Sequence, residues 1–214
     1  MKRILAIILS LIILLLCSAC GTSNETKNEV STENSKDSIK TEQIETGKEV
    51  YSSLDLASRR CSDIADKIYQ SWYFAIYKTS NEEYLNYVYY CNNVGYGMDL
   101  VEDTLKELGY TEETFPFDDF NYTIKLTKKI ETDLGTYKDI SLELSAAKDK
   151  IKTMTSEFEE STQYSKIQKY YSEVSSFYDW VSSPSGSLST ASSTIEKFES
   201  NIKNYQNELS FIYE

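Results

Sequence analysis

The chain has 214 residues, of which 22 are basic and 34 acidic, so its formal net charge is −12. A surface this acidic repels nucleic-acid phosphates and argues against nucleic-acid binding. The sequence contains no histidine, which excludes Ser-His and Cys-His catalytic pairs and histidine-ligated metal sites. With only 7 glycines and 2 prolines, turns are few, and this favours long helices over a sandwich or barrel.

The first 21 residues have the layout of an export signal. Lys2 and Arg3 precede an apolar run over residues 4–16, which is interrupted only by Ser10. This run is short for a membrane span, which takes about 20 apolar residues. It ends in LCSACG, and the small residues just before Cys20 suit a signal peptidase. We therefore expect residues 1–19 to be a signal peptide that is removed by cleavage.

This stretch resembles the lipobox of bacterial lipoproteins, although Cys17 stands where the family usually has leucine. The resemblance implies that the Cys20 thiol is joined to diacylglycerol and that Cys20 becomes the mature N-terminus. Acyl chains such as palmitate would then anchor the protein to the outer face of the cell membrane, since two chains make a stable anchor. An ordinary cleaved signal peptide and an uncleaved anchor are the alternatives. The Lys-, Asn-, Ile-, Tyr- and Ser-rich composition suggests a Gram-positive Firmicute, and the remainder resembles uncharacterised helical lipoproteins of that group.

Residues 20–48 are predicted to form a disordered tether behind the lipidated cysteine. The segment has only three sizeable apolar residues, and they form no stripe. It therefore buries too little surface to offset its ordering entropy. Cleavage removes two basic residues and no acidic ones, which leaves 20 against 34 and a mature net charge of −14.

A helical hairpin is predicted next. Apolar residues recur every three or four positions over residues 50–78 and again over residues 80–108. Between the two runs, the sequence from Ser80 to Glu83 matches a capping box, and Gly109 is a helix stop. An antiparallel register brings apolar positions face to face: Leu54 with Leu105, Cys61 with Met98, Ala65 with Val94, Ile68 with Cys91 and Trp72 with Val88.

Two features of this hairpin leave alternatives open. Gly95 and Gly97 lack the spacing of a phosphate loop, and within a helix they would permit a bend or a close helix approach. Cys61 and Cys91 lie on the inner stripes, where they would be buried free thiols, a disulfide or a reactive thiol. The register favours two free thiols, because it separates the cysteines by about 10 Å along the hairpin.

A long helix is predicted over residues 119–182, with Gly135 as its only candidate kink and no break through Phe158. Residues 182–187 are the clearest turn, and a heptad-patterned helix follows. Seven apolar pairs align about this turn, which predicts an antiparallel coiled-coil hairpin. The pairs are Val181 with Leu188, Tyr178 with Ala191, Val174 with Ile195, Tyr171 with Phe198, Ile167 with Ile202, Tyr164 with Tyr205 and Phe158 with Phe211.

The predicted fold is therefore all-α. We expect an elongated helical bundle over residues 49–214, made of a helical hairpin plus the long helix. A three-helix part covers residues 49–154, and a two-stranded coiled-coil hairpin covers residues 155–214.

Candidate chemistry is sparse, and we expect neither an enzyme nor a resident metal or cofactor. Ser145 and Lys148 have the spacing of penicillin-recognising enzymes, but the partner motifs are missing and a helix surface is the simpler interpretation. Acidic pairs are numerous, and we interpret them as solvated faces or helix starts. Loose calcium binding at Asp118 and Asp119 is the alternative, although no EF-hand pattern is present.

Aromatic residues gather at the tip of the first hairpin. They outnumber the positions of one helical stripe, so some must pack on another helix or form a partner surface. The candidate surface residues are Trp72, Tyr73, Tyr77, Tyr84, Tyr87 and Tyr90. The sequence thus predicts a membrane-tethered helical interaction or structural module with an unknown protein partner. The alternative is a solute- or glycan-binding lipoprotein that uses the aromatic tip near residues 72–96.

Overall fold

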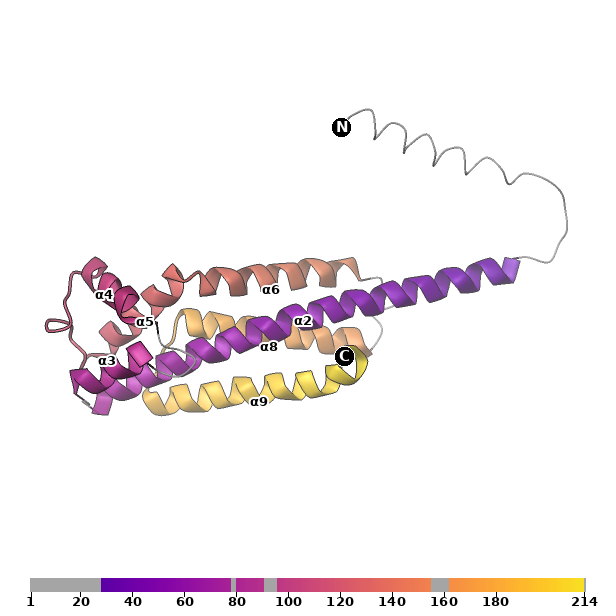
Figure 1. The fold of residues 1–214 in the computed structure, drawn as a ribbon. Helices are drawn as coiled ribbons and strands as arrows, with labels where there is room; N and C mark the ends of the chain where they lie inside the picture. Colours follow the sequence, from indigo (N-terminus) through magenta and orange to yellow (C-terminus); the bar gives the residue numbers. More distant parts are fainter. Residues whose placement is uncertain (1–27, 78–79, 91–95, 155–161, 214) are drawn as a thin grey trace, which may run out of the picture. The chain divides into compact units, whose positions relative to one another are not determined.

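The computed structural model describes residues 28–77, 80–90, 96–154 and 162–213. These residues form seven helices and no strand, which confirms an all-α helical fold (Figure 1). The chain divides into two units, residues 1–40 and 41–214. Of the first unit the structure describes residues 28–40, all helical, and the packing described below belongs to the second.

Helix α2 spans Asn28–Tyr77 and starts much earlier than expected. The predicted disordered tether is wrong for residues 28–48, which are helical, and residues 20–27 lie outside the described chain. Side chains of the predicted tether also join the core, because Gln43 is buried one turn before Gly47. Gly47 fits against the ring of Tyr213, where a Cβ atom would come within 2.6 Å of the phenol. Contact with Tyr213 near the C-terminus therefore involves a residue of the segment that was predicted to be disordered for lack of an apolar stripe.

The second predicted helix is two short helices, α3 over Asn81–Tyr90 and α4 over Met98–Glu107. The capping box is confirmed, because Ser80 and Glu83 each accept a hydrogen bond from the other's backbone N–H. Gly97 precedes α4 with φ 77°, so it lies before the start of a new helix and not within one continuous helix, as the predicted pairing required. The predicted pairing of Met98 with Cys61 is wrong, since Met98 is exposed and Cys61 is fully buried.

The long helix predicted over residues 119–182 is also divided. Helix α5 spans Phe120–Asp133 and α6 spans Thr136–Thr153, with Gly135 between them in the left-handed conformation at φ 78°. A left-handed residue cannot continue a right-handed helix, so α6 starts anew after it. The expectation of no break before Phe158 is wrong, because Met154 is extended; Phe158 itself lies outside the described residues.

Helices α8, Thr162–Ser182, and α9, Leu188–Tyr213, form the predicted antiparallel hairpin about residues 182–187. Its register differs from the prediction. Phe198 stacks on Phe177, at 4.8 Å between ring centroids, and not on Tyr171. Tyr205 lies 6.0 Å from Tyr170 and was expected opposite Tyr164. Both partners lie six residues further along α8 (177 against 171, 170 against 164).

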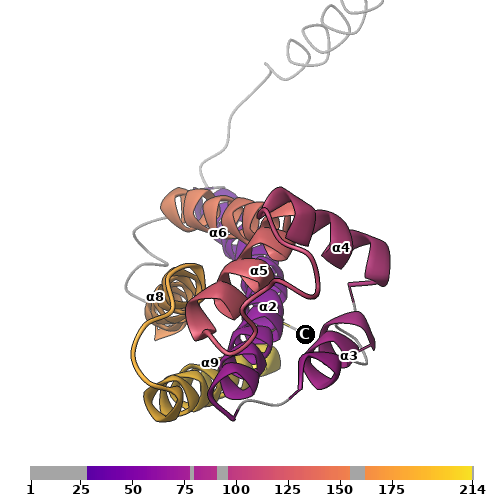
Figure 2. The ribbon, with the colours of Figure 1, turned by 90° about the vertical axis from the view of Figure 1, so that its left-hand side faces the viewer.

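The prediction for residues 155–214 was a separate two-stranded extension, and this prediction is wrong. Buried residues of α2, α6, α8 and α9 share one hydrophobic core, so the hairpin completes a four-helix bundle (Figure 2). Because α8 faces several helices at once, Tyr170 and Phe177 are fully buried beside Val174. A second core lies beneath α3, α4 and α5 and includes Phe115 and Phe117 of the intervening loop.

Candidate functional site

The candidate site lies where the C-terminal end of α2 meets the second core. Trp72 is only 2% exposed and stacks on Phe120 of α5, at 5.6 Å between ring centroids. Tyr84 of α3 is 1% exposed and packs on Phe74 and Phe117 at 5.7 and 5.1 Å. Trp72 and Tyr84 are therefore core residues, and their assignment to a partner surface is wrong.

Three side chains of α2 remain exposed at this end: Tyr73, Ile76 and Tyr77, which we call the tip patch. Their exposed fractions are 39%, 47% and 61%. The Tyr73 and Tyr77 rings lie side by side, with centroids 4.6 Å apart, because they are one helical turn apart. Tyr87 is half-buried against Phe74, at 5.2 Å between centroids. The side chain of Tyr90 lies outside the described part of the structure.

Two hollows formed by described residues near this end contain one aromatic side chain each. One groove of about 380 Å³ between α3 and the loop that joins α4 to α5 includes Tyr89, whose hydroxyl donates to Glu112. Another of about 420 Å³ beside α4 includes Tyr110. Neither groove is lined by several of the candidate aromatics, as a pocket for a sugar ring would require. The two candidate tyrosines that stay exposed, Tyr73 and Tyr77, lie side by side on the last turns of α2.

A polar seam between α2 and α5 supports the tip from beneath. Ser71 and Thr127 lie 2.7 Å apart, hydroxyl to hydroxyl, and Thr123 donates to the Ser71 carbonyl at 3.1 Å. These three side chains are buried. Their hydrogen bonds compensate for the loss of water around the hydroxyl groups.

A buried ion pair continues this seam. Lys67 of α2 lies 2.5 Å from a carboxylate oxygen of Glu131 of α5, with side chains 12% and 1% exposed. The Tyr96 hydroxyl donates to the same carboxylate at 2.5 Å, and the Lys67 ammonium lies 4.9 Å from the centre of the Tyr96 ring. Burial, followed by the negative charge of Glu131, raises the pKa of Tyr96 above its ordinary range. Tyr96 therefore stays protonated as a donor and attaches the segment before α4 to the bundle.

Sequence reasoning missed this ion pair, since its members lie 64 positions apart with no motif. A signal was nevertheless present in α5. The polar residues Thr123, Thr127 and Glu131 are spaced four positions apart, so they lie on one face of the helix. A polar stripe beside the apolar positions Ile124 and Ile130 indicates a buried polar seam.

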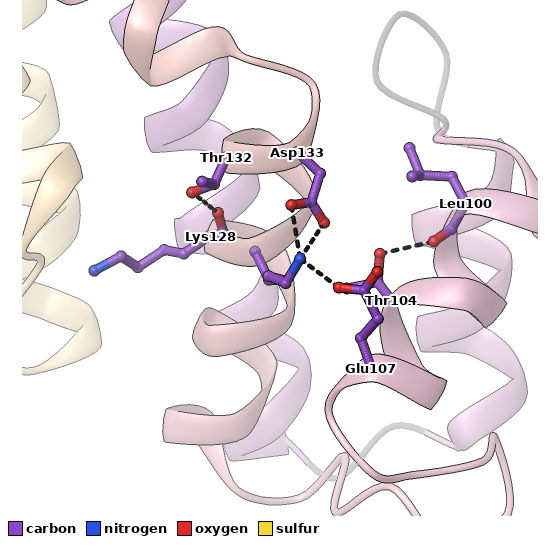
Figure 3. A network of polar contacts seen from close by, with 7 residues as sticks. Leu100, Thr104, Glu107, Lys128, Thr132 and Asp133 are labelled. Atoms are coloured by element: carbon purple, nitrogen blue, oxygen red, sulfur yellow. Dashed lines mark hydrogen bonds and ion pairs between the residues drawn. The ribbon is translucent and has the colours of Figure 1, made fainter.

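Lysines fix α5 to its neighbours on the outside (Figure 3). Lys129 contacts Glu107 of α4 and Asp133 of α5, each at 2.6 Å, and its pKa is raised mainly by the hydrogen bond to Asp133. Lys128 points to the other side and donates to the Ser182 carbonyl at the end of α8 at 2.7 Å. These contacts position α4 and α8 against α5.

The structure also locates the other residues that the sequence singled out for possible chemistry. Ser145 and Lys148 are both exposed on α6. Asp119 caps α5 by accepting from the Asn121 backbone at 2.9 Å. Cys61 is a free, buried thiol whose pKa burial raises to about 12, whereas Cys91 lies outside the described residues. The described residues contain no group of three or more acidic or cysteine side chains arranged to hold a metal ion.

Comparison with known proteins gives no relative from which to transfer a function. No protein-family model, curated protein or solved structure matches the chain. Among the described helices, none is long and apolar enough to span a bilayer. Cys20, the expected lipidation site, lies outside the described residues.

Proposed function

We propose that the protein is an extracytoplasmic lipoprotein, held on the outer face of the cell membrane by lipid on Cys20, whose helical bundle contacts a protein partner. The lipobox-like sequence before Cys20 supports the anchor. The bundle supports the second part of the proposal, because its packed helices provide a stable platform.

The tip patch is the observation that carries the interaction role. Its two tyrosines and one isoleucine stay exposed, whereas the neighbouring aromatic residues Trp72 and Tyr84 are buried. Tyrosine supplies a large, rigid contact area together with a hydroxyl group, which is typical of interface centres. Because Trp72 and Tyr84 pack beneath this end, the patch is held in place before a partner arrives. Solute or glycan binding is the weaker candidate, because neither of the two grooves formed by described residues near this end is lined by Tyr73 or Tyr77.

The anchor is tested by metabolic labelling with a fatty-acid analogue. We expect label on the wild-type protein and on Cys17→Ala, but none on Cys20→Ala, which should be released or mislocalised. An unlabelled wild-type protein that stays in the membrane fraction would exclude lipidation on Cys20.

The interaction role is tested by placing a photo-crosslinking amino acid at Tyr77 in cells that produce the protein. We expect a discrete crosslinked product from this position. Leu142 of α6 is the matched control, because it is similarly exposed at 57% but lies away from the patch. Equal crosslinking at both positions, or none at Tyr77, would argue against the tip patch as the partner surface.

A further inference from the structure

A second surface feature lies apart from the tip patch and is independent of the proposed anchor. A groove of about 750 Å³ runs between α2 and α9. Small side chains, Ser58 and Ser62 of α2 and Ser210 of α9, help to form its hollow. Its volume lies in the range of small-molecule sites, but most of the residues that line it have polar or charged side chains. Such a lining suits a charged ligand.

The register of the two helices places the charges of the groove in bands. Tyr51 packs on Tyr213 at 6.2 Å between centroids, and Gln206 donates to Asp55 at 2.8 Å, so α2 and α9 run antiparallel. One turn further along α2 from Asp55 is Arg59, which this register brings level with Lys203 of α9. A cationic band therefore crosses the groove at this level.

The next turn has the opposite charge. Four residues after Arg59, Asp63 comes level with Glu199, which lies four residues before Lys203. Across the described residues, Asp63, Glu199 and Lys203 form no ion pair. Arg59 bonds Asp55 at 2.6 Å through one nitrogen, and its side chain is 73% exposed, so other N–H groups remain available. The groove thus presents a cationic band next to an acidic one.

We propose that this groove binds short zwitterionic peptides, with the terminal carboxylate on Arg59 and Lys203 and the terminal ammonium on Asp63 and Glu199. Four helical residues separate the bands by about 6 Å. Two extended residues span at most about 7 Å, so a dipeptide matches this separation. Ser62, which lies between Arg59 and Asp63 on α2, also lines the groove and can hydrogen-bond the peptide amide.

Titration calorimetry on the full chain in detergent micelles tests this site with glycylglycine as the probe. We expect saturable binding with a Kd in the millimolar range, because the groove is open and its charges are solvated. N-acetyl-glycylglycine lacks the ammonium and glycylglycinamide lacks the carboxylate, so each should bind about threefold to tenfold more weakly. If one blocked peptide binds as well as the free one, the groove recognises a single charge and the proposal is overturned.

Two variants locate the binding in the groove. Lys203→Gln and Asp63→Asn should each weaken glycylglycine binding about threefold to tenfold. Lys197→Gln is the matched control on α9, because Lys197 is exposed and lies outside the groove, and it should bind like the wild type. Glycylglycinamide should bind equally well to the wild type and to Lys203→Gln. With circular dichroism confirming the fold, absence of saturable heat in the wild type or unchanged binding in both groove variants would refute the site.

Discussion

Removal of one member of the buried ion pair should destabilise the bundle strongly. Lys67→Met leaves Glu131, 1% exposed, without its cation. Breaking a buried ion pair in this way costs about 3–5 kcal/mol. Because Lys67 keeps 12% of its side chain exposed and Tyr96 still donates to Glu131, we expect the lower end, about 3 kcal/mol.

The double variant Lys67→Met/Glu131→Met shows how much of the lost stability comes from losing the ion pair and how much from leaving a lone charge buried. Replacing both partners by apolar side chains is often neutral, and the Tyr96 hydroxyl then loses its acceptor at about 1–3 kcal/mol. The double variant should therefore be more stable than the single one.

Urea unfolding of the chain from Gly21 onward, followed by helical circular dichroism, measures each free energy of unfolding. Lys106→Met is the control, because its ion pair with Asp103 is exposed (66% and 71%), and it should change stability by no more than about 0.5 kcal/mol. If Lys67→Met stays within about 0.5 kcal/mol of the wild type, or if the double variant is the less stable of the two, the assigned role of the pair is refuted.

Three further predictions concern single elements of the fold. Because burial raises the pKa of Cys61 to about 12, its thiol is protonated at pH 8 and should resist alkylation until urea unfolds the chain. Rapid alkylation of Cys61 in the folded protein, detected by mass spectrometry, would contradict this. Asn201 donates a hydrogen bond to Glu173 at 2.8 Å, so cysteines at these two positions should form a disulfide crosslink. Cysteines at Gln168 and Asn201, which the register predicted from the sequence places opposite each other, should not. The opposite result would support the register predicted from the sequence. Ser80→Ala should lower the free energy of unfolding by about 1 kcal/mol in urea melts, and an unchanged value would show that the cap contributes nothing.

Strong local signals in the sequence predicted some of the helix ends correctly. Ser80 caps α3 as the capping box predicted, and Gly109, with φ 85°, follows the end of α4. The turn at residues 182–187 separates α8 from α9 as expected. These features depend on a few neighbouring residues, so the sequence alone contains the information that defines them.

Predictions that depended on which helices pack against each other were less successful. Apolar periodicity is preserved when a partner shifts by about a heptad, so the pattern did not separate Tyr171 from Phe177 as the neighbour of Phe198. The pairing rule also assumed two helices, whereas α8 faces a four-helix core and buries a wider stripe. The ion pair between Lys67 and Glu131 joins distant segments, and its alignment follows from tertiary packing.

The length of α2 has a mechanical consequence. This helix runs from Asn28 to Tyr77 and carries the tip patch in its last turns. A pull on a partner bound at Tyr77 would pass along the part of α2 that belongs to the second unit, residues 41–77, through the serial backbone hydrogen bonds of one helix. Within the second unit, α6, α8 and α9 lie beside this path and brace it through the shared core. The side-chain packing of the shared core would therefore resist such a pull together with the backbone of α2.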